Sequence, residues 1–394
     1  MKKINTNIKN IRKLKNLSLL NDNHNKLPNG YVKYKNKTLK NFSSNDYLGL
    51  SRDKKLIKES VIWTKKYGTS LSSSRLVSGS LDKIDEIEKK ISKFKMKNHT
   101  IIMGSGFQCN STVIPAILEN SLGRRKKSII FSDKLNHSSI YHGCLLSKQL
   151  TKRYNHLDYD HLETLLKSNK TFGTKIIISE TVFSMDGDRV NIDNLRFLAE
   201  KYNCLLYFDE AHASGVFGKN GYGLTPKKSF KNFENEIVVG TFSKAFGSYG
   251  SYVSCSKFIK NRIINLCAGL IYSTSLPPAI LGSINAAVDK VPKINNVRQK
   301  LSRNSKYLKS KLIERGFNVA NTDSQIIPII FSDHKRCRVL AEKFINNGFY
   351  ISPILPPTVP IGKSRLRVSL TKFITKKDIN TFLEILSYLS KKYE

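Results

Sequence analysis

The sequence lacks paired cysteines and long apolar runs, and each absence excludes a class of protein. Its 6 cysteines stand far apart, at positions 109, 144, 204, 255, 267 and 337, with no Cys-x-x-Cys pair. Such spacing predicts neither a metal site nor a disulfide framework, so we expect reduced thiols in a cytoplasmic protein. No apolar run approaches the roughly 20 residues that cross a membrane. The basic residues 1–20 also lack the apolar core of a secretion signal, so we expect no membrane partner.

Acidic side chains are scarce. The chain has 30 Asp and Glu against 67 Lys and Arg, which gives a formal net charge of +37. A chain with this charge attracts polyanions. The lysines nevertheless run from end to end without a basic tail or an arginine-rich block, which favours an evenly basic surface. We therefore expect no nucleic-acid partner, and a non-enzymatic polyanion-binding protein is the alternative from another class.

Short apolar runs alternate with amphipathic stretches from about residue 99 onward. The runs are TIIMG (100–104), SIIFSD (128–133), KIIISE (175–180), LLYFDE (205–210), EIVVGTF (236–242) and SYVSC (251–255). Continuous apolar strands separated by helices predict an α/β fold, with a mostly parallel sheet covered on both faces. In such sheets the ligand site lies at the carboxyl ends of the strands.

The pattern changes after about residue 280. A helical stretch leads to the strand patterns QIIPIIFSD, FYISPIL and RLRVSLT, and a last helix begins at about residue 376. These elements predict a smaller α+β domain, and a length of 394 residues suits two or three domains. The expected division is an N-terminal arm (1–44), a large cofactor-binding domain (45–280) and a small C-terminal domain (281–394).

The letters Asp-Glu-Ala-His at positions 209–212 are typical of nucleic-acid helicases, but the rest of that machinery is missing. A helicase also needs the phosphate loop G-x-x-x-x-G-K-[ST] upstream of this box. The Gly-Lys-Ser at 362–364 lies downstream, and Pro357 stands where the first glycine of the loop belongs. The sequence therefore excludes a nucleotide-driven motor.

The same residues suit pyridoxal phosphate. Its pyridine nitrogen must stay protonated to accept electrons, and a buried carboxylate such as Asp209 fixes that proton. His212 is placed to reach the ring hydroxyl. A lysine must carry the cofactor as a Schiff base, and Lys244 follows the next strand among small residues. Thr241 and Ser243, just before it, can donate to the phosphate.

Two upstream blocks fit the same interpretation. GSGFQCN (104–110) follows a strand and opens a helix, which is the anion-binding geometry of a helix N-terminus. NHSSI places His137 after another strand, where its ring can stack on the pyridine. Alone, the glycines could form a mere turn, His137 could be a core histidine, Asp209 a helix cap and Lys244 a solvated loop lysine. Their occurrence in order, each at a strand end, favours the cofactor site.

The chain resembles the α-oxoamine synthases, fold type I pyridoxal-phosphate transferases that condense an amino acid with an acyl thioester. The likeness runs from about residue 41 to the C-terminus. It lies in NFSSNDYLGLS, SRLVSGS, GSGFQCN, NHSSI, ETVFSMDGD, FDEAHASGVFGKNGYG, TFSKAFG, IYSTSLPPA and PPTVPIGKSRLRVSLT. The resemblance implies pyridoxal 5'-phosphate as cofactor and a homodimer with its sites at the subunit interface. Two blocks, NFSSNDYLGLS and PPTVPIGKSRLR, are most similar to members that join L-alanine to a pimeloyl thioester of coenzyme A or acyl carrier protein.

The resemblance also implies a role for each matching residue. Lys244 attaches the cofactor and moves the α-proton, Asp209 pairs with the pyridine nitrogen and His212 pairs with the ring hydroxyl. His137 stacks on the ring. The other implied cofactor contacts are Gly106, Phe107, Ser184, Thr241, Ser243 and, from the other subunit, Thr274. The implied substrate contacts are Arg367 and Asn45 for the amino-acid carboxylate and Thr358 for the acyl group.

Three features leave alternatives open. The glycine C-acetyltransferase, 5-aminolevulinate synthase and serine palmitoyltransferase types share the cofactor residues and differ in pocket size. Ser72 and Ser73 stand where many relatives carry glycine. Relatives also use an arginine of the N-terminal arm to bind the acyl substrate, and Arg12 is the only arginine in residues 1–50 of this chain. Arg365 has the same side chain as Arg367, and strand alternation places both on one face.

Overall fold

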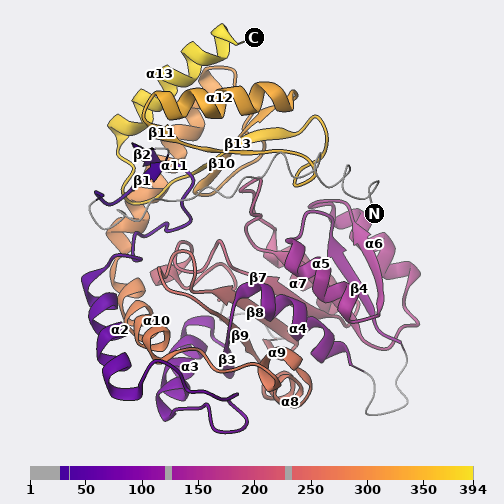
Figure 1. Ribbon diagram of the computed structural model, residues 1–394. Helices are drawn as coiled ribbons and strands as arrows, with labels where there is room; N and C mark the ends of the chain where they lie inside the picture. Colours follow the sequence, from indigo (N-terminus) through magenta and orange to yellow (C-terminus); the bar gives the residue numbers. More distant parts are fainter. Residues whose placement is uncertain (1–26, 35, 120–126, 227–232, 394) are drawn as a thin grey trace, which may run out of the picture.

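The computed structural model describes residues 27–34, 36–119, 127–226 and 233–393, and a seven-stranded sheet lies at the centre of the larger part (Figure 1). Its strand order is β3 (His99–Met103), β9 (Ser251–Cys255), β8 (Glu236–Thr241), β7 (Leu205–Asp209), β6 (Lys175–Glu180), β4 (Ile129–Asp133) and β5 (Leu150–Tyr154). Strand β9 runs antiparallel to β3 and β8, and the other pairs are parallel. The mostly parallel sheet predicted from the sequence is confirmed.

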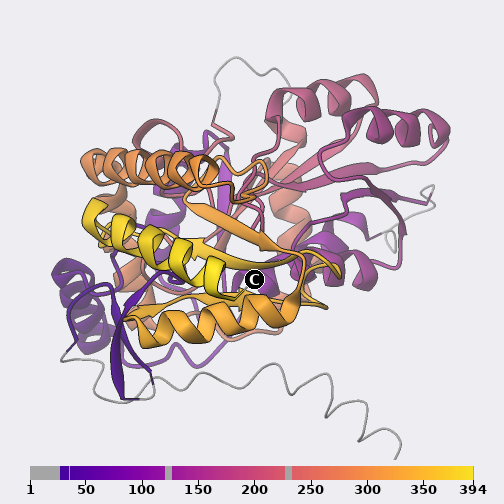
Figure 2. The same cartoon turned by 90° about the horizontal axis from the view of Figure 1, so that it is seen from above.

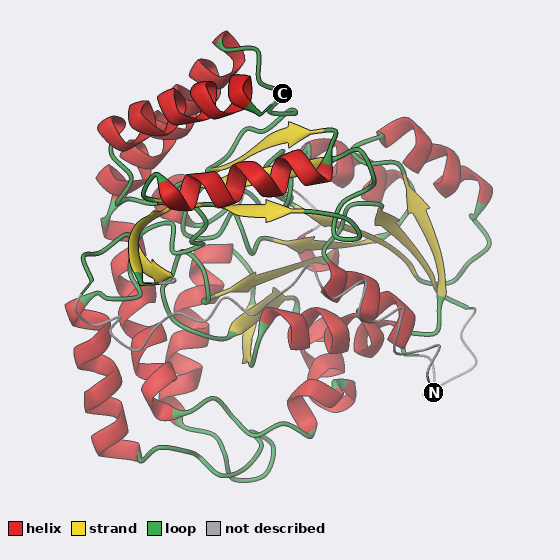
Figure 3. Ribbon diagram, turned by 45° about the horizontal axis from the view of Figure 1, so that its top comes forward, coloured by secondary structure: helices red, strands yellow, loops and turns green. Residues whose placement is uncertain are grey.

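Helices cover both faces of this sheet (Figure 3). One face packs against α4 (Gly106–Leu118), α5 (Ser138–Leu146), α8 (Lys257–Leu266) and α9 (Ala268–Ile271), and the other against α6 (Tyr159–Ser168) and α7 (Ile192–Lys201). Alternate strand residues supply the two layers, since Ile176 and Ile178 join the first core cluster and Ile177 joins the second. Burial on both faces explains why these strands are continuous apolar runs.

A helical layer beside the sheet consists of α2 (Lys54–Tyr67), α3 (Asp82–Lys95) and α10 (Pro278–Lys290). Helices α10 and α2 pack closely because Gly282 has no side chain, and a Cβ there would lie 2.6 Å from the Trp63 ring. Helix α10 extends across the predicted boundary at residue 280. The hydrophobic cluster around it continues into the C-terminal part.

The C-terminal part contains a second, antiparallel sheet of β10 (Ile326–Phe331), β13 (Ser364–Ser369) and β12 (Ser352–Ile354). Figure 2 shows α11 (Asn295–Glu314), α13 (Lys376–Lys392) and α12 (His334–Asn346) lying side by side against it. Helix α13 begins at a capping box, in which Thr375 and Asp378 bind each other's backbone N–H. Short 3₁₀ turns lie at Lys219–Gly221, Phe233–Asn235 and Val291–Lys293.

The described part of the predicted N-terminal arm belongs to the C-terminal part of the fold. Strands β1 (Tyr31–Tyr34) and β2 (Lys37–Asn41) form a hairpin, and β2 pairs with β11 (Phe349–Tyr350). Arg12 and the rest of residues 1–26 lie outside the described residues. The division of the chain at 44/45 and 280/281 stays a prediction. Along the described segments, no helix combines the length and the apolar character needed to span a bilayer.

The turn that contains Ser72 and Ser73 has a backbone conformation at Ser72 that is typical of glycine. Ser72 adopts a φ of 54°, in the left-handed region that glycine enters freely and other residues rarely. Gly79 closes over the same turn, where an added Cβ would overlap the carbonyl oxygen of Ser73.

Candidate active site

The carboxyl ends of three neighbouring strands bring acidic and hydroxyl side chains together. Glu180 ends β6, Asp209 ends β7 and Thr241 ends β8. The strand register places Glu180 directly beside Asp209. His212 and Lys244 lie in the turns that follow β7 and β8. This is the edge of the sheet at which the sequence predicts the site.

Lys244 points at an imidazole. Its Nζ lies 2.9 Å from Nε2 of His212. Burial lowers the pKa of Lys244 to about 8, although the carboxyl groups of Asp209 and Glu180 act to raise that pKa. An amine must be uncharged to attack a carbonyl, so this environment makes Lys244 a nucleophile near neutral pH.

Asp209 is held by donors on both of its oxygens. Asn110 Nδ2 donates to Oδ2 at 2.7 Å, and the backbone N–H of Ala211 donates to Oδ1 at 2.8 Å. Tyr207 orients Asn110 by donating to its Oδ1 at 2.7 Å. The side chain of Asp209 is only 6% exposed. Sequence reasoning selected Asp209 and missed Asn110, although Asn110 is the last letter of the GSGFQCN block.

His212 connects the lysine to the N-terminal segment of the chain. Its Nδ1 lies 2.6 Å from the hydroxyl of Tyr47, a residue that sequence reasoning also missed. Burial lowers the pKa of His212 well below its usual value, and the charges of Lys244 and Arg367 lower it further. Burial likewise raises the pKa of Tyr47. Both groups are therefore neutral at neutral pH.

Glu180 is a second buried carboxyl group at the same strand ends. Its exposed fraction is 2%, and within the described residues its Oε1 has no hydrogen-bond partner. Burial raises the pKa of Glu180 well above its usual value, and the charge of Asp209 raises it further. Burial therefore favours the protonated form of Glu180.

His137 caps the helix that follows β4. Its Nδ1 accepts from the backbone N–H of Ser139 at 3.2 Å and lies 2.7 Å from the hydroxyl of that serine. The ring is thus held at one edge. The histidine is otherwise exposed in the single chain. A fixed ring with an open face is what a stacking contact requires.

The amino end of α4 supplies unused backbone donors. The helix begins at Gly106, with Ser105 as its N-cap, and Phe107 in its first turn is 48% exposed. Ser243 is exposed, whereas the hydroxyl of Thr241 donates to the carbonyl of Gly250 at 2.8 Å. Oγ of Ser243 accepts from the hydroxyl of Thr241 at 3.1 Å, and its exposed hydroxyl can donate to an anion together with the helix N–H groups. Thr241 instead stabilises the turn in this structure.

Arg367 has no acidic partner within the described residues. Its Nε donates to the carbonyl of Ser184 at 2.6 Å, and its Nη1 donates to Ser369 Oγ at 2.6 Å. Asn45 Oδ1 lies 3.3 Å from Nη1 and 3.4 Å from Nη2. The guanidinium is thus oriented by neutral groups while its charge stays uncompensated. A buried charge of this kind favours an anionic ligand.

Arg365 has a different environment, although strand alternation could not separate it from Arg367. Its Nη1 forms an ion pair with Asp186 and also donates to the carbonyl of Met185. The charge of Arg365 is therefore neutralised by the protein itself. The sequence-based preference for Arg367 as the carboxylate clamp remains a prediction, and the two environments favour it.

A cavity of about 780 Å³ opens between His137, Ser184 and Thr358. Its wall includes Leu145 and Arg153, so it combines apolar surface with one cation. Thr358 is exposed there, in the loop between β12 and β13. The volume suits a small organic molecule with an extended chain.

Among the residues that the structure describes, no hydrogen bond joins the side chain of Thr274 to Lys244, Asp209 or His212. Thr274 is exposed, forms an isolated β-bridge with Ser74, and lies beside Gly104 in a small pocket. Its expected contact with a phosphate of the other subunit stays a prediction. Within the described ranges, no group of three His, Cys, Asp or Glu side chains is arranged to hold a metal ion.

The donor set suits the expected cofactor, pyridoxal phosphate. Lys244 offers an amine to its aldehyde, and Asp209 offers a doubly hydrogen-bonded carboxylate to its ring nitrogen. The amino end of α4 offers N–H groups to its phosphate. Each reactive part of the cofactor therefore finds a group of matching chemistry at one edge of the sheet.

Comparisons of the sequence with known proteins show the family to which the chain belongs. The sequence model of the family described as Aminotransferase class I and II matches residues 37–386. A provisionally named 8-amino-7-oxononanoate synthase of Paramagnetospirillum magneticum is 42% identical over 358 residues, which is 91% of this chain and 90% of that protein.

Solved structures resemble the whole chain. A serine palmitoyltransferase from S. paucimobilis with bound PLP and myriocin has a TM-score of 0.89 at 23% identity, over 99% of this chain and 97% of its own. An 8-amino-7-oxononanoate synthase from Francisella tularensis has a TM-score of 0.75 at 28% identity, over 90% of this chain and 98% of its own. At 23% identity the first likeness shows the fold alone.

Proposed function

The chain belongs to the class I and II aminotransferase family and is a pyridoxal-phosphate-dependent acyltransferase of the 8-amino-7-oxononanoate synthase type, and from this premise we propose that it condenses L-alanine with a pimeloyl thioester. The products are 8-amino-7-oxononanoate, carbon dioxide and the free thiol. This reaction belongs to biotin synthesis. The predicted cytoplasmic location stays a prediction.

The cofactor, when bound, supplies an aldehyde for covalent attachment and a protonated ring that accepts electrons. In our proposal Lys244 is the attachment point, because its pKa of about 8 leaves a useful fraction of uncharged amine. The same amine would also remove the proton from the α-carbon of bound alanine. Asp209 keeps the proton on the ring nitrogen, and Asn110 fixes the orientation of that carboxylate.

Arg367 binds the carboxylate of alanine in this proposal. A guanidinium can form two parallel hydrogen bonds to a carboxylate, and Asn45 and the carbonyl of Ser184 already hold its plane. A fixed carboxylate sets the orientation of the bonds at the α-carbon. The α-carbon then bonds to the carbonyl carbon of the thioester as the thiol leaves. The carboxylate of alanine then leaves as carbon dioxide, and a proton takes its place on the α-carbon.

The acyl chain takes the cavity of about 780 Å³ in this proposal. Leu145 and Tyr141 give it apolar wall, Thr358 stands at its rim, and Arg153 can face an anionic part of the donor. The observation that carries the proposal is the position of Ser184. It lines this cavity and its carbonyl accepts from Arg367, so the carboxylate clamp and the acyl cavity adjoin one residue.

A paired assay tests the acyl donor. The purified enzyme is incubated with L-alanine and either pimeloyl-coenzyme A or pimeloyl-acyl carrier protein, and carbon dioxide and product mass are measured. We expect product with at least one of the two donors. An enzyme that releases thiol from neither, yet accepts a palmitoyl or acetyl thioester, would overturn the proposal.

The second candidate is a serine palmitoyltransferase activity. The chain shares the fold of that enzyme, with a TM-score of 0.89, and the expected cofactor residues are common to both activities. The amino donor separates the two, since one reaction takes alanine and the other serine. A non-enzymatic polyanion-binding protein, by contrast, gives no reason for the Lys244–His212 contact.

We also propose a homodimer with its sites at the subunit interface. Large apolar side chains near the site are exposed in the single chain, namely Phe107 at 48%, Val77 at 81% and Tyr272 at 84%. Thr274 is exposed beside Tyr272, where a second subunit would meet it. Exposed apolar surface of this kind commonly marks a protein interface. Light scattering on the purified enzyme measures the subunit number directly.

A further inference from the structure

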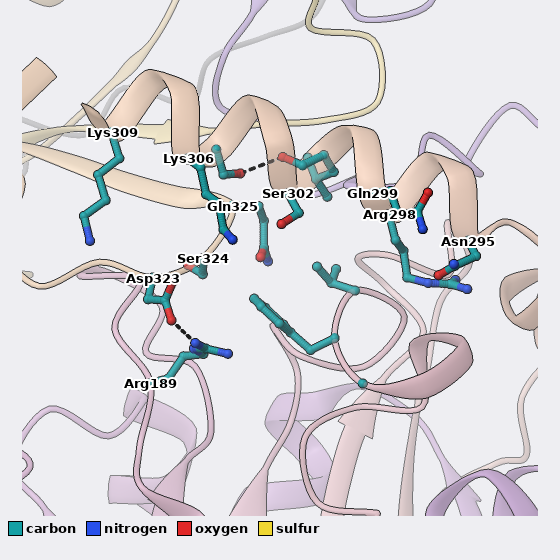
Figure 4. Close-up of a pocket in the computed structure, with 15 residues that line it drawn as sticks. Arg189, Asn295, Arg298, Gln299, Ser302, Lys306, Lys309, Asp323, Ser324 and Gln325 are labelled. Atoms are coloured by element: carbon teal, nitrogen blue, oxygen red, sulfur yellow. Dashed lines mark hydrogen bonds and ion pairs between the residues drawn. The ribbon is translucent and has the colours of Figure 1, made fainter. Parts of the chain in front are cut away.

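A second cavity, of about 470 Å³, lies between helix α11 and the loops that contain residues 216–218 and 323–325 (Figure 4). It shares no lining residue with the cavity of about 780 Å³. Helix α11 forms one wall. The other walls come from residues 216–218, from Arg189 and from residues 323–325. No role in the proposed reaction falls on this cavity.

The charge of the lining is strongly positive. Four cationic side chains, from Arg189, Arg298, Lys306 and Lys309, face one carboxylate, that of Asp323. Arg189 already forms an ion pair with Asp323. Within the described residues, no carboxylate pairs with the other three cations. The cavity therefore keeps an uncompensated positive charge.

Two of its polar side chains are buried with an atom left unbonded. Arg298 is 5% exposed, and Gln325 is 2% exposed. The guanidinium of Arg298 donates to the carbonyl of Val291 at 2.6 Å. Among the described residues, however, Nε of Arg298 has no acceptor and Oε1 of Gln325 has no donor. Burial acts to lower the pKa of Arg298, and an anion bound beside the guanidinium would offset the cost of burying its charge.

Helix α11 presents a row of polar side chains to the cavity. Gln299, Ser302, Lys306 and Lys309 are spaced three or four residues apart, which places them on one face of a helix. Figure 4 shows Ser302 and Lys306 extending from α11 towards Gln325, and Lys309 extending from the same side. Neutral donors thus stand between the cations.

We propose that this cavity binds a small organic anion that carries two or more phosphate or carboxylate groups. Guanidinium and ammonium groups are the side chains that bind such oxygens best. The volume lies in the range of small-molecule sites and is too small for a polymer. Gln325 also donates from its Nε2 to the carbonyl of His212 at 3.0 Å, so the anion would lie directly behind the catalytic histidine.

The test is isothermal titration calorimetry of the cofactor-saturated enzyme with inorganic pyrophosphate, and with citrate in a parallel series. Saturating the cofactor site keeps the probes away from the amino end of α4. We expect saturable one-to-one binding of at least one probe, and the tighter probe identifies phosphate or carboxylate as the preferred group. The double variant Lys306→Gln, Lys309→Gln should bind about tenfold or more weakly, because it loses two charged hydrogen-bond donors.

The matched control is Lys300→Gln, Lys311→Gln, which removes the same charge from the same helix outside the cavity. This control should bind like the parent enzyme. Ser302→Asp provides a second variant, and because Ser302 is exposed it should fold and lose binding by charge repulsion. Absence of saturable binding to the parent enzyme would overturn the proposal. Equal losses in both lysine pairs, or a loss in Arg153→Gln alone, would also overturn it.

Discussion

Nζ of Lys244 lies 2.9 Å from Nε2 of His212, so the amine proposed to hold the cofactor rests against an imidazole and not against a carboxylate. Burial lowers the pKa of Lys244 to about 8 and lowers that of His212 well below its usual value. A salt bridge would have raised the pKa of the amine and kept it charged. Burial, together with the charge of Arg367, therefore increases the fraction of uncharged amine that can attack a carbonyl.

Lys244→Ala should abolish turnover. Without its amine the enzyme has no group for covalent attachment of the cofactor and no base for the α-proton. Borohydride reduction of the parent enzyme, followed by peptide mapping, should place the cofactor label on Lys244. Lys257→Ala, an exposed lysine at the start of α8, is the control and should retain activity. A label on another lysine would refute the assignment of Lys244 as the attachment point.

Asp209→Asn should slow the chemical step by on the order of 10²–10³-fold and weaken cofactor binding, because an amide cannot stabilise the protonated ring nitrogen. Single-turnover kinetics and fluorescence titration of the cofactor measure the two effects. Asp160→Asn, on the exposed first turn of α6, is the matched control. Near-normal kcat in Asp209→Asn would show that this carboxylate is only structural.

Arg367→Lys should raise the KM for alanine by roughly 10–100-fold, since lysine is a point charge and loses the planar two-bond contact. Arg365→Lys should change KM little, because that arginine is already paired with Asp186. Steady-state kinetics with alanine as the varied substrate compare the two variants. If Arg365→Lys is the one that loses alanine, the clamp has been assigned to the wrong residue.

The ion triad of His156, Asp133 and Asp188 predicts a pH dependence of stability. Nδ1 of His156 lies 2.9 Å from Asp133 and Nε2 lies 2.7 Å from Asp188. Burial alone would lower the pKa of His156, but hydrogen bonds to the two carboxylates raise it to about 10. The histidine therefore binds its proton more tightly in the folded state. Its stabilising effect is complete below the unfolded pKa of about 6.5 and is lost as the pH rises to about 10.

Urea unfolding of the parent enzyme and of His156→Gln checks this window. The difference in unfolding free energy should be larger at pH 6 than at pH 10. His334→Gln, an exposed histidine at the start of α12, should show a small difference at both pH values. A difference for His156→Gln that grows with pH would contradict the account.

The large sheet could be predicted because its strands are buried on both faces. KIIISE and SYVSC match β6 and β9 residue for residue, since each is a short apolar run between polar turns. Strand β5 (Leu150–Tyr154) was missed because it lies at the edge of the sheet, where Lys152 and Arg153 interrupt the apolar pattern. The hairpin of β1 and β2 was missed because its strands are short and carry lysines that break the apolar pattern. The pairing of β2 with β11 joins Lys40 to Phe349 and leaves no local signal.

The site could be predicted where its residues follow strands, as Asp209 and Lys244 do. Contacts between distant segments could not be predicted in the same way. Tyr47 reaches His212 across 165 positions, and Asn110 reaches Asp209 across 99. Neither contact leaves a local pattern in the sequence. The different environments of Arg365 and Arg367 likewise depend on Asp186, which only the folded chain brings close.

The most direct test of the proposed reaction is the choice of amino donor. Carboxyl-labelled alanine, serine and glycine are compared at fixed pimeloyl thioester, and labelled carbon dioxide and free thiol are counted together. We predict that alanine has the highest kcat/KM, by at least about tenfold, and that it releases one carbon dioxide for each thiol. A higher kcat/KM for serine or glycine, or thiol release without carbon dioxide, would contradict the account.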